Sequence, residues 1–118
     1  MNKNSFLILL LLFFLPLFSI AQDAKSHIEN LKAQLKENPD AKKTASIYSD
    51  LTWYYSNISS DSALHYGSKA ILESKKLSDS TLQAQVFSDI GAVYFIKGDF
   101  QNSKENYLQA YKIRKARK

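Results

Sequence analysis

The feature that most constrains this chain is an internal repeat with a period of about 40 residues, a length typical of stacked helical units. Residues 87–110 follow the pattern Phe-x2-Ile-Gly-x2-Tyr-x3-Gly and then Ser-x3-Tyr-x2-Ala. Residues 48–70 follow the related pattern Tyr-x2-Leu-Thr-x2-Tyr and then Ala-x3-Gly-x2-Ala. Thr52 of the first copy corresponds to Gly91 of the second, and Ala63 corresponds to Ser103. Such self-similarity indicates stacked copies of one small structural unit.

The apolar residues after Gln22 recur at helical spacing, and no segment alternates long enough to suggest a strand. One helix must stop before Pro39. The turn and capping residues predict four more helices. The second starts near Asp40, Asp61 caps the third, a capping box of Ser80 and Gln83 opens the fourth, and Asp99 caps the fifth. Short loops make successive helices antiparallel, so we expect an all-α, antiparallel array of helical hairpins with about five helices after residue 21.

The same spacing predicts which side chains face inward. In the second helix these are Ala45, Tyr48, Leu51, Thr52 and Tyr55. In the third and fourth they are Ala63, Tyr66, Gly67, Ala70, Ile71, Phe87, Ile90, Gly91 and Tyr94. In the last helix they are Phe100, Ser103, Tyr107, Ala110 and Tyr111.

The repeat resembles the tetratricopeptide repeat (TPR) family, in its longer-helix bacterial variant. The resemblance covers residues 44–117 and implies a right-handed α-solenoid in which small residues let paired helices approach closely. The second copy matches better, with Gly91 and Ser103 as the small pair. The packing positions that the resemblance assigns are Thr52, Tyr55, Ala63, Ala70, Gly91, Tyr94, Gly98, Ser103, Tyr107 and Ala110.

Some positions depart from the family pattern. The first copy has no turn glycine, and Lys75 and Lys115 stand where a proline is expected after the second helix. The period also exceeds the roughly 34 residues of the common repeat. We divide the chain into residues 22–39 (N-terminal helix), 40–78 (first TPR-like repeat) and 79–118 (second TPR-like repeat with a basic end).

Residues 1–21 are typical of a signal peptide. Lys3 precedes the apolar run of residues 6–18, and Ser19-Ile20-Ala21 provides a cleavage site, so we expect cleavage after Ala21. The boundary also resembles that of secreted Bacteroidota proteins, which implies a periplasmic or extracellular location. The alternative is an uncleaved membrane anchor formed by residues 6–18, but this run is short for a bilayer.

Composition and charge exclude several classes of function. The chain has no cysteine and only two histidines, His27 and His65, so it lacks the groups for a thiolate, a histidine-rich metal site or a cysteine nucleophile. We expect no metal and no cofactor. The last seven residues hold five cations, while residues 22–111 are close to neutral. The basic tail is either a solvated helix end or a contact for an acidic partner or anionic lipid, and nothing suggests a nucleic-acid face.

The resemblance implies a peptide or a partner helix bound on the concave face formed by the first helix of each repeat. The candidate groove residues are Ser49, Asp50, Trp53, Ser56, Gln85, Ser88, Asp89, Ala92 and Phe95. Trp53 is either an interface anchor or a contact to the preceding helix around Leu31 and Leu35. Asp50 and Asp89 either favour basic or amide-rich ligands or are ordinary solvated residues. The Lys, Arg and Asn cluster of chaperone-tail-binding repeats is missing, which disfavours capture of a C-terminal carboxylate.

Three classes of function remain. We favour a non-catalytic protein-interaction module, exported from the cytoplasm. The second is the N-terminal sensory part of a longer signalling protein, such as a histidine kinase or a transcriptional regulator. The third, a small enzyme, has the least support, because no serine lies in a nucleophile elbow and no loop is long enough for a lid. The final helix has no successor to cover its outer side, so we expect marginal stability, self-association through this end, or a missing C-terminal portion.

Overall fold

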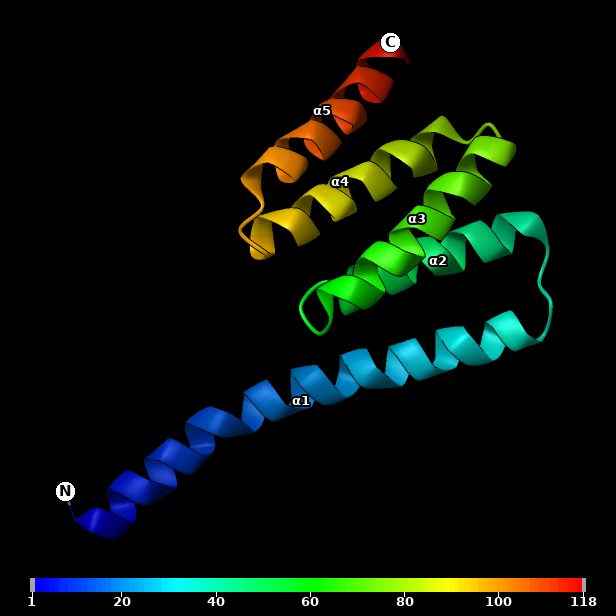
Figure 1. Ribbon diagram of the computed structural model, residues 1–118. Coiled ribbons are helices and arrows are strands. Elements are labelled where there is room, and N and C mark those ends of the chain that lie inside the picture. Colours follow the sequence, from blue (N-terminus) through cyan, green and yellow to red (C-terminus); the bar gives the residue numbers. More distant parts are fainter. Residues whose placement is uncertain (1, 118) are drawn as a thin grey trace.

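The computed structural model describes the backbone of residues 2–117 and the side chains of residues 2–13 and 22–117. All regular secondary structure in this part of the chain is helical. The helices are α1 (Lys3–Lys36), α2 (Ala41–Tyr55), α3 (Ser60–Lys76), α4 (Ser80–Ile96) and α5 (Phe100–Ala116). Figure 1 shows two antiparallel hairpins, α2–α3 and α4–α5, with α1 running along α2. The predicted all-α, TPR-like helical array is confirmed.

Residues 22–36 of the segment expected to be an N-terminal helix (residues 22–39) form the second part of α1. This helix is continuous with the predicted signal peptide and ends at the C-cap Glu37, before Pro39. Its first part projects beyond the array (Figure 1), and the apolar side chains of residues 6–13 are exposed there. Pro16 and Ala21 lie outside the described side chains. Among the described residues, no helix combines the length and the apolar character needed to span a bilayer.

Two apolar clusters hold the array together. In the first, Ile28 of α1 packs with Ile47 and Leu51 of α2, and Leu31 and Leu35 lie against them. In the second, Ala70 of α3 packs with Val86 and Ile90 of α4, with Tyr48, Leu64 and Ile71 around them. Each cluster joins neighbouring helices, so the core is a series of helix–helix contacts along the array.

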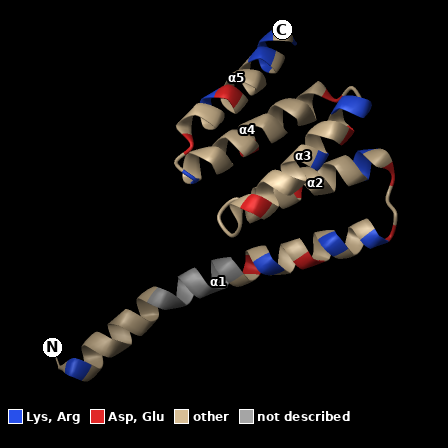
Figure 2. Cartoon of the chain, in the orientation of Figure 1, with Lys and Arg blue, Asp and Glu red and all other residues tan. Residues whose placement is uncertain are grey.

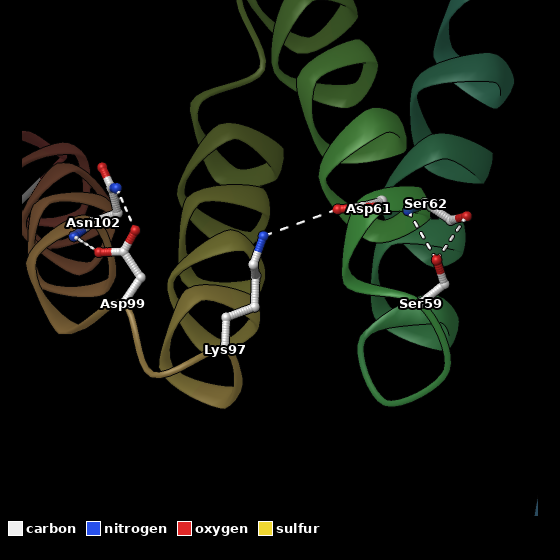
Figure 3. Close-up of polar contacts among 6 residues, drawn as sticks. All are labelled: Ser59, Asp61, Ser62, Lys97, Asp99 and Asn102. Carbon is white, nitrogen blue, oxygen red and sulfur yellow. Dashed lines mark hydrogen bonds and ion pairs between the residues drawn. The ribbon is translucent and has the colours of Figure 1, made fainter.

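The helix caps follow the predicted turns but not always the predicted residues (Figure 3). Asp40 is the N-cap of α2, which was expected to start near this residue. Asp99 caps α5 as expected. The predicted cap of α3 is wrong, because Ser59 accepts the hydrogen bond from the Ser62 backbone nitrogen. Asp61 instead lies in the first turn, and its Oδ1 is 3.9 Å from Lys97 Nζ of the other hairpin.

The predicted capping box of α4 is also wrong. Asp79 Oδ1 accepts a hydrogen bond of 2.9 Å from the Leu82 backbone nitrogen, so Asp79 is the N-cap and Ser80 is the first helical residue. Gln83 Nε2 reaches the carbonyl oxygen of Ser74 on α3 instead of the turn. The side chain that predicted a local cap therefore joins two helices.

We predict that Asp79→Ala lowers the free energy of unfolding by about 1 kcal/mol, because it removes the acceptor that satisfies a backbone N–H at the start of α4. Ser80→Ala, one residue later, is the matched control and should change it by less than about 0.5 kcal/mol. Urea denaturation followed by circular dichroism measures both. A larger loss for Ser80→Ala would show that the cap is misassigned.

The predicted inward face of α5 is only partly correct. Ser103 and Ala110 are buried, but Phe100, Tyr107 and Tyr111 are exposed. The predicted inward-facing residues of α5 form a stripe that recurs at helical spacing, as expected. However, within the described chain only α4 packs against α5, so the stripe is covered on one side and open on the other.

Candidate functional site

Close packing between paired helices sets the position of the candidate site. Ser103 Oγ donates a buried hydrogen bond of 2.8 Å to the carbonyl oxygen of Gly91, so α5 lies tightly against α4. A Cβ atom at Gly91 would stand 3.1 Å from the ring of Tyr107. In the first hairpin, the equivalent residues Thr52 and Ala63 are both fully buried. The first helices of the two repeats, α2 and α4, also contact each other.

An open cavity of about 330 Å³ lies between α2 and α4. Ser49, Asp50, Trp53 and Tyr54 line it from α2, and Gln85 and Asp89 line it from α4. Five of these six residues belong to the predicted groove set. We call this cavity the α2–α4 groove. The structure therefore brings together the part of the predicted set that surrounds the two aspartates and Trp53.

The two aspartates give the groove its electrostatic character. Asp89 is buried, with an exposed fraction of 6%, and its Oδ1 accepts a hydrogen bond of 3.0 Å from Gln85 Nε2. Loss of hydration raises the pKa of Asp89, Gln85 and Arg114 oppose this rise, and the negative charge of Asp50 adds to it. Desolvation also raises the pKa of Asp50, against the effect of Lys43. Because both carboxylates are disfavoured in their charged form, a cation between them would relieve an electrostatic cost.

Trp53 is the largest exposed aromatic side chain of the groove, with 59% of its surface accessible. The neighbouring Tyr54 lies against the cluster of Ile28, Ile47 and Leu51, and Trp53 is not among the partly buried residues of that cluster. The ring of Tyr54 also stacks on His27 of α1, with 5.0 Å between the ring centroids. Tyr54 is the groove residue that the sequence analysis missed. Its position three residues after the buried Leu51 was the available signal.

Four predicted groove residues do not line the cavity. Ser56 is buried, and its hydroxyl donates to the carbonyl oxygen of Trp53. Ser88 turns toward α5, where its Oγ accepts a hydrogen bond of 2.9 Å from Arg114. Ala92 is half-buried, and Phe95 lies against the ring of Phe100 at 5.4 Å between centroids.

The basic end of α5 is partly structural. Figure 2 shows Lys and Arg gathered near the C-terminus of this helix. Arg114 folds back onto α4, where Nη1 contacts Ser88 Oγ and Nη2 lies 3.5 Å from the carbonyl oxygen of Ala84. Lys112, Lys115 and Arg117 remain exposed. Arg114, one of the cations of the predicted basic tail, therefore contributes to the packing of α5 on α4.

The described residues include no group of three or more His, Cys, Asp or Glu side chains that could hold a metal ion. His65 is exposed and meets Tyr66 edge-on. His27 lies 3.4 Å from Asp23, one turn earlier on α1. Neither histidine lines the α2–α4 groove.

Comparison with known families agrees with this architecture. The family model described as the SusR N-terminal TPR domain matches residues 19–117, which is most of the chain. Comparison with curated proteins and with solved structures found no match. The match spans both hairpins and the part of α1 that packs on α2. The chain therefore belongs to the SusR N-terminal TPR domain family.

Proposed function

We propose that this TPR domain is an exported, non-catalytic interaction module that binds a basic or amide-rich peptide in the α2–α4 groove. TPR domains act in general as protein–protein interaction scaffolds, and most characterised ones have no catalytic role. The observation that carries the proposal is the groove itself, in which Trp53 is exposed beside Asp50 and Asp89. The predicted signal peptide supports a periplasmic or extracellular location.

The arrangement suits a cationic side chain. The exposed ring of Trp53 offers a face for a Lys or Arg group, and cation–π contacts of this kind contribute about 0.5–2 kcal/mol. The carboxylates of Asp50 and Asp89 supply the opposite charge, and Gln85 can exchange its hydrogen bond to Asp89 for one to a peptide. Aromatic residues in desolvated pockets are frequent hot spots of binding.

We expect Trp53→Ala and Asp89→Lys each to weaken partner binding by roughly ten-fold or more. The first change removes the aromatic surface, and the second places a cation where the ligand's own cation would lie. The assay is a pull-down from periplasmic extract, in which the partners retained by the full chain and by each variant are compared. Circular dichroism establishes that each variant is folded.

Leu72→Ala is the matched control, because Leu72 is an exposed apolar residue on α3 that does not line the groove. It should retain the same partners as the unchanged chain. Identical partners for the unchanged chain and both groove variants would refute the groove as the binding site.

Binding should also weaken as the pH falls through the raised pKa values of Asp50 and Asp89, since protonation removes the charges that attract the ligand.

A second proposal is that the domain is the N-terminal sensory part of a longer signalling protein, such as a histidine kinase or a transcriptional regulator. The description of the family as an N-terminal TPR domain favours it. In that arrangement the groove would bind the signal. A reading frame that continues past Lys118 into further repeats and a transmembrane segment would support this proposal, and a stop codon directly after Lys118 would count against it.

A further inference from the structure

The α2–α4 groove contains a carboxylate that is almost enclosed but incompletely paired. Asp89 has an exposed fraction of 6%, and its Oδ1 accepts the hydrogen bond from Gln85 Nε2. Its other oxygen, Oδ2, accepts no hydrogen bond from the described residues. Every fully enclosed side-chain nitrogen or oxygen in the described part of the chain has a partner, so Oδ2 is not fully enclosed. The opening that Asp89 lines is the groove, from which a ligand can reach this oxygen.

The two aspartates of the groove have no cation of the described chain as an ion-pair partner, since the ion pairs there involve other acids. The guanidinium group of Arg114 donates to Ser88 instead. Desolvation first, and the negative charge of Asp50 in addition, raise the pKa of Asp89 against the effects of Gln85 and Arg114. The two carboxylates therefore interact, and one external cation between them would serve both.

The polar atoms that Asp50, Gln85 and Asp89 present in the groove are mainly hydrogen-bond acceptors. Gln85 uses Nε2 as a donor to Asp89, which leaves its Oε1 as an acceptor. Asp50 adds two carboxylate oxygens, and Asp89 adds Oδ2. The complementary ligand therefore supplies several donors. A guanidinium group supplies five N–H donors in one plane and no acceptor, whereas an ammonium group supplies three.

The exposed ring of Trp53 favours a guanidinium group over an ammonium group for a second reason. This ring lines the same cavity, with 59% of the residue's surface accessible. A planar guanidinium group stacks flat on such a ring and still directs its N–H groups sideways to carboxylates. It is also more weakly hydrated than an ammonium group, so it loses less hydration when it approaches the nearly enclosed Asp89.

We propose that the α2–α4 groove is a pocket for an arginine side chain and selects arginine over lysine. The guanidinium group stacks on Trp53 and donates hydrogen bonds to Asp89 Oδ2 and to Asp50. This selectivity rests on the proposed function, which places a basic or amide-rich peptide in the groove, and it names the side chain that the groove recognises.

Three small probes test the selectivity with the full chain. They are N-acetyl-arginine amide, its lysine counterpart, and its citrulline counterpart, which keeps the shape of arginine but has no charge. Trp53 is the only tryptophan of the chain, so its fluorescence reports binding at the groove directly. We expect the arginine probe to bind with a Kd of about 1 mM, and the other two probes to bind at least roughly five-fold more weakly. Amide shift changes in ¹⁵N spectra should centre on Trp53, Tyr54, Gln85 and Asp89.

Asp89→Asn should weaken binding of the arginine probe roughly ten-fold, because it removes the charge but keeps the size of the side chain and an acceptor for Gln85. Asp61→Asn is the matched control. The Asp61 side chain is 98% exposed on α3 and does not line the groove, so its change should leave the Kd unaltered.

Trp53→Leu provides a second variant that alters only an exposed side chain. It keeps an apolar group but removes the ring, so the preference for arginine over lysine, measured from amide shifts, should fall below about two-fold.

Equal affinity for the arginine and lysine probes, or for the arginine and citrulline probes, would overturn the proposal. Arginine shift changes outside the groove, or no saturable binding of arginine below about 10 mM, would also overturn it. These outcomes are distinct from failure of the proposed function, which is decided by the pull-down. If Trp53→Ala and Asp89→Lys lost their partners there while the probes showed no preference for arginine, the groove would remain the binding site and only the arginine selectivity would be wrong.

Discussion

Leu51→Ala is expected to lower the free energy of unfolding by about 2–5 kcal/mol. Leu51 is fully buried, and its side chain packs with Ile28 of α1 and Ile47 of α2. Many other core positions in this chain are alanine, serine or glycine, so few large side chains carry the apolar contacts. The loss of one of them should remove a large share of the stability of a small array.

Urea denaturation followed by circular dichroism measures this loss. Leu72→Ala is the control, since 55% of the Leu72 side chain is exposed on α3, and it should change the free energy of unfolding by less than about 0.5 kcal/mol. Hydrogen exchange should show in addition that Leu51→Ala releases α1 first, because α1 is held mainly by the cluster around Leu51. Equal losses for the two variants would show that this cluster does not hold the array together.

The helices could be predicted from the sequence because each one ends in a strong local signal. Pro39 stops α1, Asp40 begins α2, and Gly98, with a φ of 80°, provides the left-handed turn before α5. The exact caps were harder to predict where several polar residues are adjacent. Ser59 and Asp61 both have side chains that can cap α3, and only the backbone conformation decides between them. Ser59 is extended, with φ −151° and ψ 103°, whereas Asp61 is already helical.

The orientation of α5 illustrates a different limit. Spacing identifies a stripe of Phe100, Tyr107 and Tyr111, but burial also requires a helix that packs on it. Only α4 packs on α5 in the described chain, so the buried part of the stripe is restricted to the side of Ser103 and Ala110. A sequence pattern predicts which residues can pack together, and the number of neighbouring helices decides how many of them do.

The groove was predicted in part for a similar reason. The repeat register places Asp50 and Asp89 at equivalent positions, and the structure puts both in one cavity with Trp53. The register could not show that Arg114 would reach back from α5 and engage Ser88. It also could not show that Tyr54 would contribute to the groove while it stacks on His27. Contacts to a third helix depend on crossing geometry, which a two-helix repeat pattern does not contain.

Gly91→Val is expected to lower the free energy of unfolding by about 1–3 kcal/mol. A Cβ atom at this position already stands 3.1 Å from Tyr107 Cγ and Cδ2, so the two methyl groups of valine overlap the ring. Valine also has a higher helix propensity than glycine, by a few tenths of a kcal/mol, so propensity alone predicts a small gain. A decrease in the free energy of unfolding, measured by urea denaturation, would therefore show the effect of the steric contact between α4 and α5.

A double-mutant cycle separates this contact from other effects. Tyr107→Ala should destabilise the unchanged chain, because it removes the ring that covers Gly91, but it should stabilise the Gly91→Val variant by making room for the methyl groups. Tyr111→Ala is the control, since Tyr111 is exposed on the same helix and its ring is not the one beside Gly91, and it should give no such rescue. Additive losses for Gly91→Val and Tyr107→Ala would mean that the helices of the second repeat do not depend on this close approach. The structural equivalence of Gly91 and Ser103 with Thr52 and Ala63 would then fail.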